Sequence, residues 1–172
     1  MADTNLLIGN LSDVSTTQSQ PLGLLYTEPP EFGADRDTGT AGTTRSGSRT
    51  WIYVYNGTAG TLAAGSVVSR AAGASTYSVR ACPASSSPQA AVGVVVTAIP
   101  TLNYGWVVRS GLVEVTADSA STISADTAIT IGTGATAGRA QTVAAVTGNA
   151  FGVATEGAAV GVNALCQVDC RG

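Results

Sequence analysis

The stretch Gly105-Trp106-Val107-Val108-Arg109-Ser110-Gly111-Leu112-Val113-Glu114-Val115-Thr116-Ala117 decides the fold of this chain. Successive side chains of a β-strand point to opposite faces, and β-branched residues favour strands. The alternation therefore places Trp106 and Val108 on one face before the glycine. Val113 and Val115 share a face after it. Glycine adopts a positive φ easily, so Ser110-Gly111 predicts a bulge or sharp bend between two short strand segments.

The chain on either side of this stretch repeats the same pattern of short apolar segments and turns. Segments rich in Val, Ile, Thr and aromatic residues alternate with turns rich in Gly, Ser and Thr, and no helix of ten or more residues is indicated. The expected strands are 51–55, 64–68, 77–82, 91–99, 127–131, 139–143, 151–154 and 162–170. We therefore predict an all-β protein, with a single β-sandwich or β-barrel-like domain over residues 49–172.

Residues 1–48 differ from the rest in composition and predict an extended N-terminal arm. They are rich in Thr, Ser, Gly, Gln and Pro, and Pro29-Pro30 favours an extended path. We expect the apolar side chains of this arm to contact a partner protein or a neighbouring copy. These side chains are Leu6, Leu7, Ile8, Leu11, Leu24, Leu25 and Tyr26.

The aromatic side chains of the next strand are further candidates for partner contact, namely Trp51, Tyr53 and Tyr55. Packing in the core or at a subunit interface is the alternative that their position in a strand favours. A core built from small side chains buries little apolar area, and Ala and Val dominate the 44% of residues that are hydrophobic. We therefore expect the chain to associate with copies of itself or with a larger partner.

The charge pattern excludes several classes of partner. The net charge is -3, the chain contains no Lys, and its arginines form no cluster, so we expect no direct binding of nucleic acid. No apolar run approaches the roughly 20 residues that span a bilayer, and the first residues lack the pattern of a secretory signal. The sequence therefore predicts neither a membrane protein nor a secreted one.

The residues that usually carry catalysis are missing or scattered. The chain has no His, the commonest general base, and without Lys no phosphate-binding loop is present. Glu114, Asp118 and Asp126 could form a carboxylate pair, but a solvated or salt-bridged face fits them better. Asp35 and Asp37 could suggest calcium, although a solvated turn fits them better because other oxygen ligands are missing. We therefore predict no enzyme, no cofactor and no metal site.

The three cysteines are expected to be buried structural thiols. Cys166 and Cys170 share one face of a strand about 13 Å apart, which is too far for a disulfide between them. Together with Cys82 they also lack the spacing of metal ligands.

Several phrases together resemble structural proteins of tailed-bacteriophage heads, and more narrowly the capsid decoration, or cement, proteins. They are WIYVYN at 51–56, LAAGSVV at 62–68, VGVVVTAI at 92–99, YGWVVRSG at 104–111 and CQVDCRG at 166–172. The resemblance covers about residues 50–172 and rests on the order of these phrases. It implies a β-rich homotrimer, made in the host cytoplasm, that lies on the outer surface of the capsid and clamps neighbouring major capsid protein subunits.

A small β-rich oligomer is physically suited to that role. A small symmetric oligomer can engage several shell subunits at once, and linked weak contacts gain from effective concentration. The main alternative is a phage tail or fibre-associated protein that binds a host surface. A cell-surface adhesin-like module and an enzyme with carboxylate chemistry are the other two.

Overall fold

The computed structural model describes residues 11–28, 48–73, 77–84, 87, 90–143 and 150–172. These ranges contain ten strands and no α-helix, so the all-β prediction is confirmed for them. No helix in them is long and apolar enough to cross a membrane. The strands are β1 (Leu25–Glu28), β2 (Arg49–Asn56), β3 (Val67–Arg70), β4 (Ser78–Ala81), β5 (Ala91–Val95), β6 (Tyr104–Thr116), β7 (Ala128–Ile131), β8 (Ala140–Thr142), β9 (Gly152–Ala154) and β10 (Asn163–Asp169).

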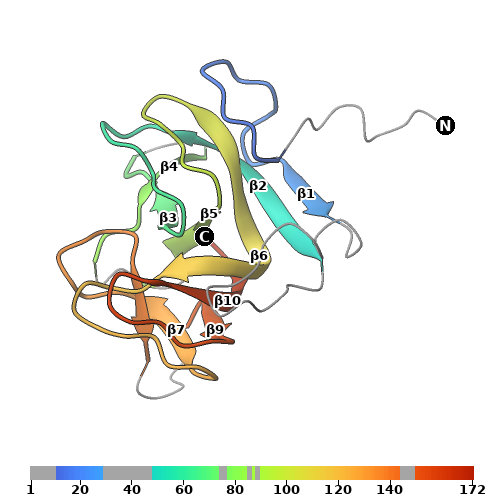
Figure 1. The fold of residues 1–172 in the computed structure, drawn as a ribbon. Helices are drawn as coiled ribbons and strands as arrows, with labels where there is room; N and C mark the ends of the chain where they lie inside the picture. Colours follow the sequence, from blue (N-terminus) through green and yellow to red (C-terminus); the bar gives the residue numbers. More distant parts are fainter. Residues whose placement is uncertain (1–10, 29–47, 74–76, 85–86, 88–89, 144–149) are drawn as a thin grey trace.

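The first half of the chain forms a closed ring of strands. β2 pairs with β4, β4 with β3, β3 with β5, β5 with β6, and β6 again with β2. The β2–β4 pairing is parallel and the others are antiparallel. β1 adds to the same edge of β2 as β4, next to its first residues. The result is a small barrel, which Figure 1 shows in its upper part.

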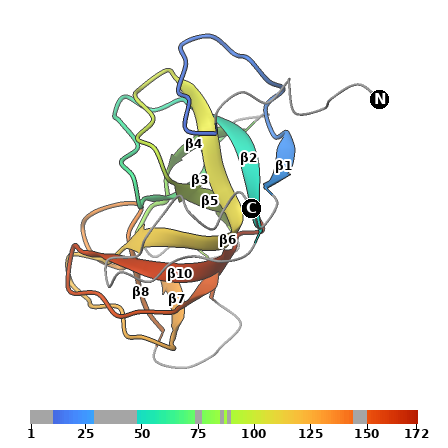
Figure 2. The same ribbon diagram turned by 45° about the vertical axis from the view of Figure 1, so that its right-hand side comes forward.

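The second half forms another ring on the far end of β6. β6 pairs with β10, β10 with β9, β9 with β7, and β7 with β8, all antiparallel. A parallel bridge between Ala117, directly after β6, and Ala140 of β8 closes this ring. Figures 1 and 2 both show the two groups of strands, with β6 passing from one into the other.

β6 is one continuous strand, whereas its sequence predicted two short segments. Its first part pairs with β2, and its second part, from Ser110, pairs with β10. The predicted irregularity is present, because Thr50 faces Ser110 while Trp51 faces Val108, which leaves Arg109 as an extra residue. Gly111 has a φ of +117°, the positive value expected for it. A bulge next to a glycine lets one strand serve both rings.

Two apolar clusters follow from the alternation along the strands. The smaller one draws on every strand of the first ring and fills it: Ile52, Val54, Leu62, Val68, Val79, Val92, Val95, Ile99 and Val107. The larger one extends from the second ring, where it includes Val113 and Val115, to the outer face of the first, where Trp106 and Val108 lie. The sequence predicted both of these pairs.

Part of the predicted N-terminal arm lies against the chain's own first ring. Ser15 and Tyr104 exchange two backbone hydrogen bonds, and the amide of Gly23 donates to the carbonyl of Tyr53. Leu11 is buried in the larger cluster. Residues 11–28 thus form a strap, our name for this segment, over the outer face of the ring. The rest of the arm, with Leu6, Leu7, Ile8, Asp35 and Asp37, lies outside the described residues.

Several strand boundaries differ from those predicted. The strand expected over 64–68 begins only at Val67, because Gly65 turns the chain with a φ of +78°. The apolar run 91–99 forms β5 only up to Val95, and Ile99 pairs in an isolated bridge with Leu62.

We expect Gly111→Ala to lower the free energy of unfolding by about 3 kcal/mol. The strain of a positive φ in alanine and the close contacts of its Cβ atom both contribute to this loss. A Cβ atom at this position would lie 2.7 Å from Cγ of Arg49 and 2.9 Å from the carbonyl oxygen of Ser48. Urea unfolding followed by tryptophan fluorescence measures the loss. Gly73→Ala is the control, since Gly73 also has a positive φ but a Cβ atom there would meet no other atom within 4 Å. It should cost about 1 kcal/mol. Equal losses in the two variants would contradict the contact at Gly111.

Candidate functional site

The three carboxylates considered as a catalytic set, those of Glu114, Asp118 and Asp126, lie in different surroundings. Glu114 accepts a hydrogen bond of 3.1 Å from the side-chain amide of Asn163. Asp118 is fully buried, whereas Asp126 is exposed and has a φ of +57°. Among the described residues, no group of three or more His, Cys, Asp or Glu side chains could hold a metal ion.

Asp118 has a structural role that its sequence context did not predict. One carboxylate oxygen accepts from the amide of Gly134 at 2.7 Å, and the other accepts from the amide of Ser119 at 2.6 Å. A Cβ atom on Gly132 or Gly134 would come within 3 Å of this carboxylate. The Gly132-Thr133-Gly134 phrase therefore leaves room for a buried carboxylate that holds the β7–β8 hairpin against the end of β6. This Gly-Thr-Gly phrase was the one signal for the role in the sequence.

The cysteines are buried thiols, as predicted. Burial raises the pKa of Cys166 from its ordinary value of 9.0 to about 12, and the carboxylate of Glu156 adds to the rise. Burial also raises the pKa of Cys170 from 9.0 to about 12, with a further contribution from Asp169. Thiols that keep their protons at neutral pH are poor nucleophiles and poor metal ligands.

A buried ion pair joins the strap to the first ring. Glu28 at the end of β1 faces Arg49 at the start of β2, and both side chains are 3% exposed. The Nε atom of Arg49 lies 3.4 Å from a carboxylate oxygen of Glu28, and Nε1 of Trp51 donates to the same oxygen at 3.0 Å. The guanidinium of Arg49 also lies 5.3 Å from the centre of the Trp51 ring. Removing either Glu28 or Arg49 alone would leave the other charge buried and unpaired, which is strongly destabilising. The cluster therefore fixes the position of β1.

The aromatic candidates for partner contact divide into buried and accessible residues. Trp51 and Tyr53 are only 4% and 2% exposed, and they pack beneath the strap. The hydroxyl of Tyr53 accepts from the backbone amide of Ser19 at 3.2 Å. Packing in the chain's own core, the alternative that their strand position favoured, accounts for both residues. Tyr55 is partly exposed and its ring lies 4.8 Å from that of Tyr104.

The apolar candidates on the strap show the same division. Leu11 is buried, Leu24 and Tyr26 are partly exposed and pack against the larger cluster, and Leu25 is 51% exposed. Leu25 is thus the most accessible apolar side chain among the candidate residues that the structure describes. Contact between these residues and a partner stays a prediction.

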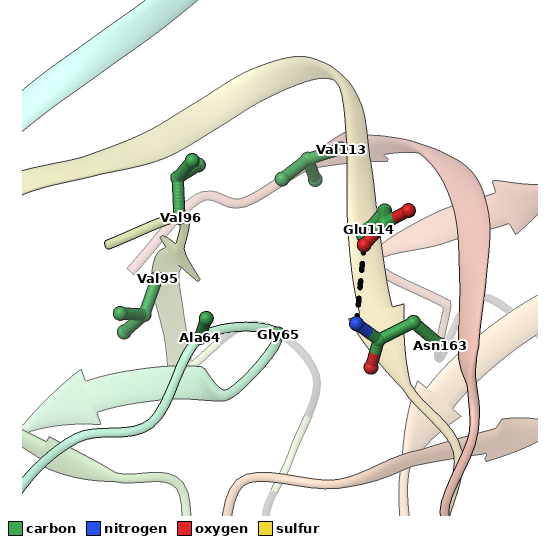
Figure 3. Close-up of a pocket in the computed structure, with 7 residues that line it drawn as sticks. All are labelled: Ala64, Gly65, Val95, Val96, Val113, Glu114 and Asn163. Carbon is green, nitrogen blue, oxygen red and sulfur yellow. Dashed lines mark hydrogen bonds between the residues drawn. The ribbon is translucent and has the colours of Figure 1, made fainter. Parts of the chain in front are cut away.

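A small pocket lies where the end of β5 approaches the second part of β6. Its volume is about 60 Å³, and it is lined by Ala64, Gly65, Val95, Val96, Val113, Glu114 and Asn163. Figure 3 shows the valines and Ala64 around one side of the pocket and the hydrogen-bonded pair of Glu114 and Asn163 on the other. Strand alternation predicted a solvated face for Glu114 and gave no sign of a role for Asn163.

Comparison with solved structures finds a likeness that concerns the fold. No protein-family model and no curated protein sequence matches the chain. Among solved structures, the chain is similar to the head fiber gp8.5 N base of bacteriophage phi29, with a TM-score of 0.52 and 16% sequence identity. The similarity covers 69% of this chain and 94% of that one. The two chains therefore share a fold over nearly the whole of the fiber base.

We expect the ionisation of Cys166 and Cys170 to leave the free energy of unfolding unchanged below pH 9. The free energy of unfolding should then fall as the pH rises from 9 to about 12. The unfolded chain releases a thiol proton near its ordinary pKa, whereas the folded protein keeps it up to the raised pKa, so folding is disfavoured in that window. Urea unfolding at a series of pH values measures the decline.

The double variant Cys166→Ala, Cys170→Ala is the comparison for this experiment, because tyrosines also titrate in the window. The variant should show a shallower decline than the original protein. Identical slopes would contradict the raised thiol pKa values.

Proposed function

We propose that this chain is a structural protein of a bacteriophage particle, bound to the outside of the head as a decoration, or cement, protein. The observation that carries the proposal is the fold shared with the phi29 head fiber base over 94% of that chain. The phrases that resemble decoration proteins, such as those at 51–56 and 104–111, form β2 and the first part of β6. In this proposal both lines of support point to the surface of a phage head.

The mechanism in this proposal is bridging without catalysis. A folded domain that contacts two neighbouring major capsid protein subunits opposes their separation, and several copies joined as a homotrimer multiply the effect through effective concentration. The carboxylate of Asp118 holds a loop, that of Glu114 binds a neighbouring side chain, and the buried thiols keep their protons, which agrees with a role in binding. The protein is not proposed to act as an enzyme.

A fibre-associated role is the second candidate, since the fold neighbour is itself the base of a fiber. In that case the domain attaches to the particle and positions a host-binding part. A fibre that extends outward from the bound domain, on the head or on the tail, distinguishes this alternative from a cement protein, which covers the shell in a regular array and carries no such extension.

A binding assay tests the head-surface proposal. Heads purified from particles that lack the chain are mixed with the purified protein, sedimented and analysed for bound protein. We expect saturable binding with a fixed number of copies per shell and a higher temperature of shell disruption. Protein that stays in the supernatant at saturating concentration would overturn the proposal.

Within that assay, we expect Leu25→Ser to weaken head binding about tenfold, because an apolar side chain buried at an interface contributes roughly 1.5–3 kcal/mol. Val153→Ser is the matched control, since Val153 is 46% exposed and lies on β9 in the second ring, whereas the strap covers the first ring. It should bind heads like the original protein. If the two variants bind equally well, Leu25 is not part of the contact surface.

A further inference from the structure

We propose that the pocket beneath the bend of β6 is a binding site for a lysine side chain of a partner protein. The pocket combines one carboxylate, from Glu114, with apolar walls from Val95, Val96, Val113 and Ala64. A lysine side chain has the complementary form, an apolar stem that ends in a compact positive charge. The inference concerns this pocket alone and does not depend on which partner the protein has.

The pocket is a consequence of how the loop before β3 joins two strands. Gly65, with a positive φ, donates its amide to the carbonyl of Val95 at 2.8 Å and accepts from the amide of Thr116 at 3.0 Å. A Cβ atom on Gly65 would lie 2.2 Å from Oγ1 of Thr116, so only glycine allows this close approach. The loop thereby holds the end of β5 and the second part of β6 at a fixed separation, with the pocket between them.

A chain of hydrogen bonds holds the carboxylate at the side of the pocket. Thr116 donates through Oγ1 to Oδ1 of Asn163 at 2.8 Å, and Nδ2 of Asn163 donates to Oε2 of Glu114 at 3.1 Å. Glu114 is half-buried. A half-buried carboxylate that is already oriented loses less entropy on binding a cation than a freely rotating surface carboxylate does.

The geometry favours lysine over arginine. Arginine binds carboxylates best through two parallel hydrogen bonds, one to each oxygen. Asn163 already uses Oε2, and no donor among the described residues bonds to Oε1 of Glu114. An ammonium group needs only one oxygen. A pocket of about 60 Å³ also has room for a few water-sized groups, such as an ammonium and the last methylenes of its stem.

The ligand has to come from another molecule, because this chain contains no lysine. Arg49 pairs with Glu28 and Arg171 pairs with Asp169 in the described ranges, and neither pair involves Glu114.

The test uses the full chain and Nα-acetyl-lysine amide as the probe, followed by NMR. We expect saturable shifts of the Asn163 side-chain amide and of the Val95, Val96 and Val113 methyl groups, with a dissociation constant in the millimolar range. Nα-acetyl-norleucine amide, which has an apolar side chain without charge, should bind at least about fivefold more weakly.

Two variants and one control make the test decisive. Glu114→Gln keeps an acceptor for Asn163 but removes the charge, and should weaken lysine binding about fivefold. Ala64→Leu, at an exposed position on the rim, should block the pocket without disturbing the core. Asp126→Asn, an exposed carboxylate elsewhere, should leave binding unchanged. The proposal is wrong if the probe causes no saturable shifts at the pocket, if norleucine binds equally well, or if Glu114→Gln binds lysine like the original protein.

Discussion

The whole structure depends on the bend of β6, because this one strand belongs to both rings. The first part closes the ring of β2 to β5, and the second part supports β7 to β10. The change of partner occurs within a few residues, at the bulge near Arg109 and at Gly111, where Ser48 and Arg49 pack directly against the glycine. A side chain at position 111 would collide with these neighbours. One residue without a Cβ atom therefore lets the two halves of the chain share one ten-stranded sheet.

The alternation of neighbouring side chains predicted most of the strands. It did not predict the closure into two rings, because that closure depends on pairings between residues distant in sequence. Alternation along β6 placed Trp106, Val108, Val113 and Val115 correctly, because each assignment needs only neighbouring residues. The closure into two rings rests on the parallel pairing of β2 with β4 and on the bridge between Ala117 and Ala140, and neither has a local signal. The N-terminal arm was predicted to contact a partner or a neighbouring copy, which stays a prediction; its described part, the strap, covers the chain's own aromatic face.

The same distinction holds for the side chains considered as sites. The cysteines were predicted to be buried from their strand pattern, and they are. The burial of Asp118 could not be predicted, because its partners, the amides of Gly134 and Ser119, become available only when the β7–β8 hairpin folds back onto β6. The pocket near Glu114 likewise needs the loop of Gly65 to meet a part of β6 that is distant in sequence. The pocket proposed to bind lysine therefore became visible only in three dimensions.

Together these features describe a small, weakly charged β-protein with buried thiols and loop-holding carboxylates, a fold shared with a phage head fiber base, and a role we propose on the surface of a phage head. A cryo-electron microscopy map of the virus particle that carries this chain tests the central claim most directly. We predict density for the two-ring domain at regular positions on the outside of the head, in contact with more than one major capsid protein subunit. A map in which the head surface is bare, with the domain on the tail or missing from the particle, would contradict the claim.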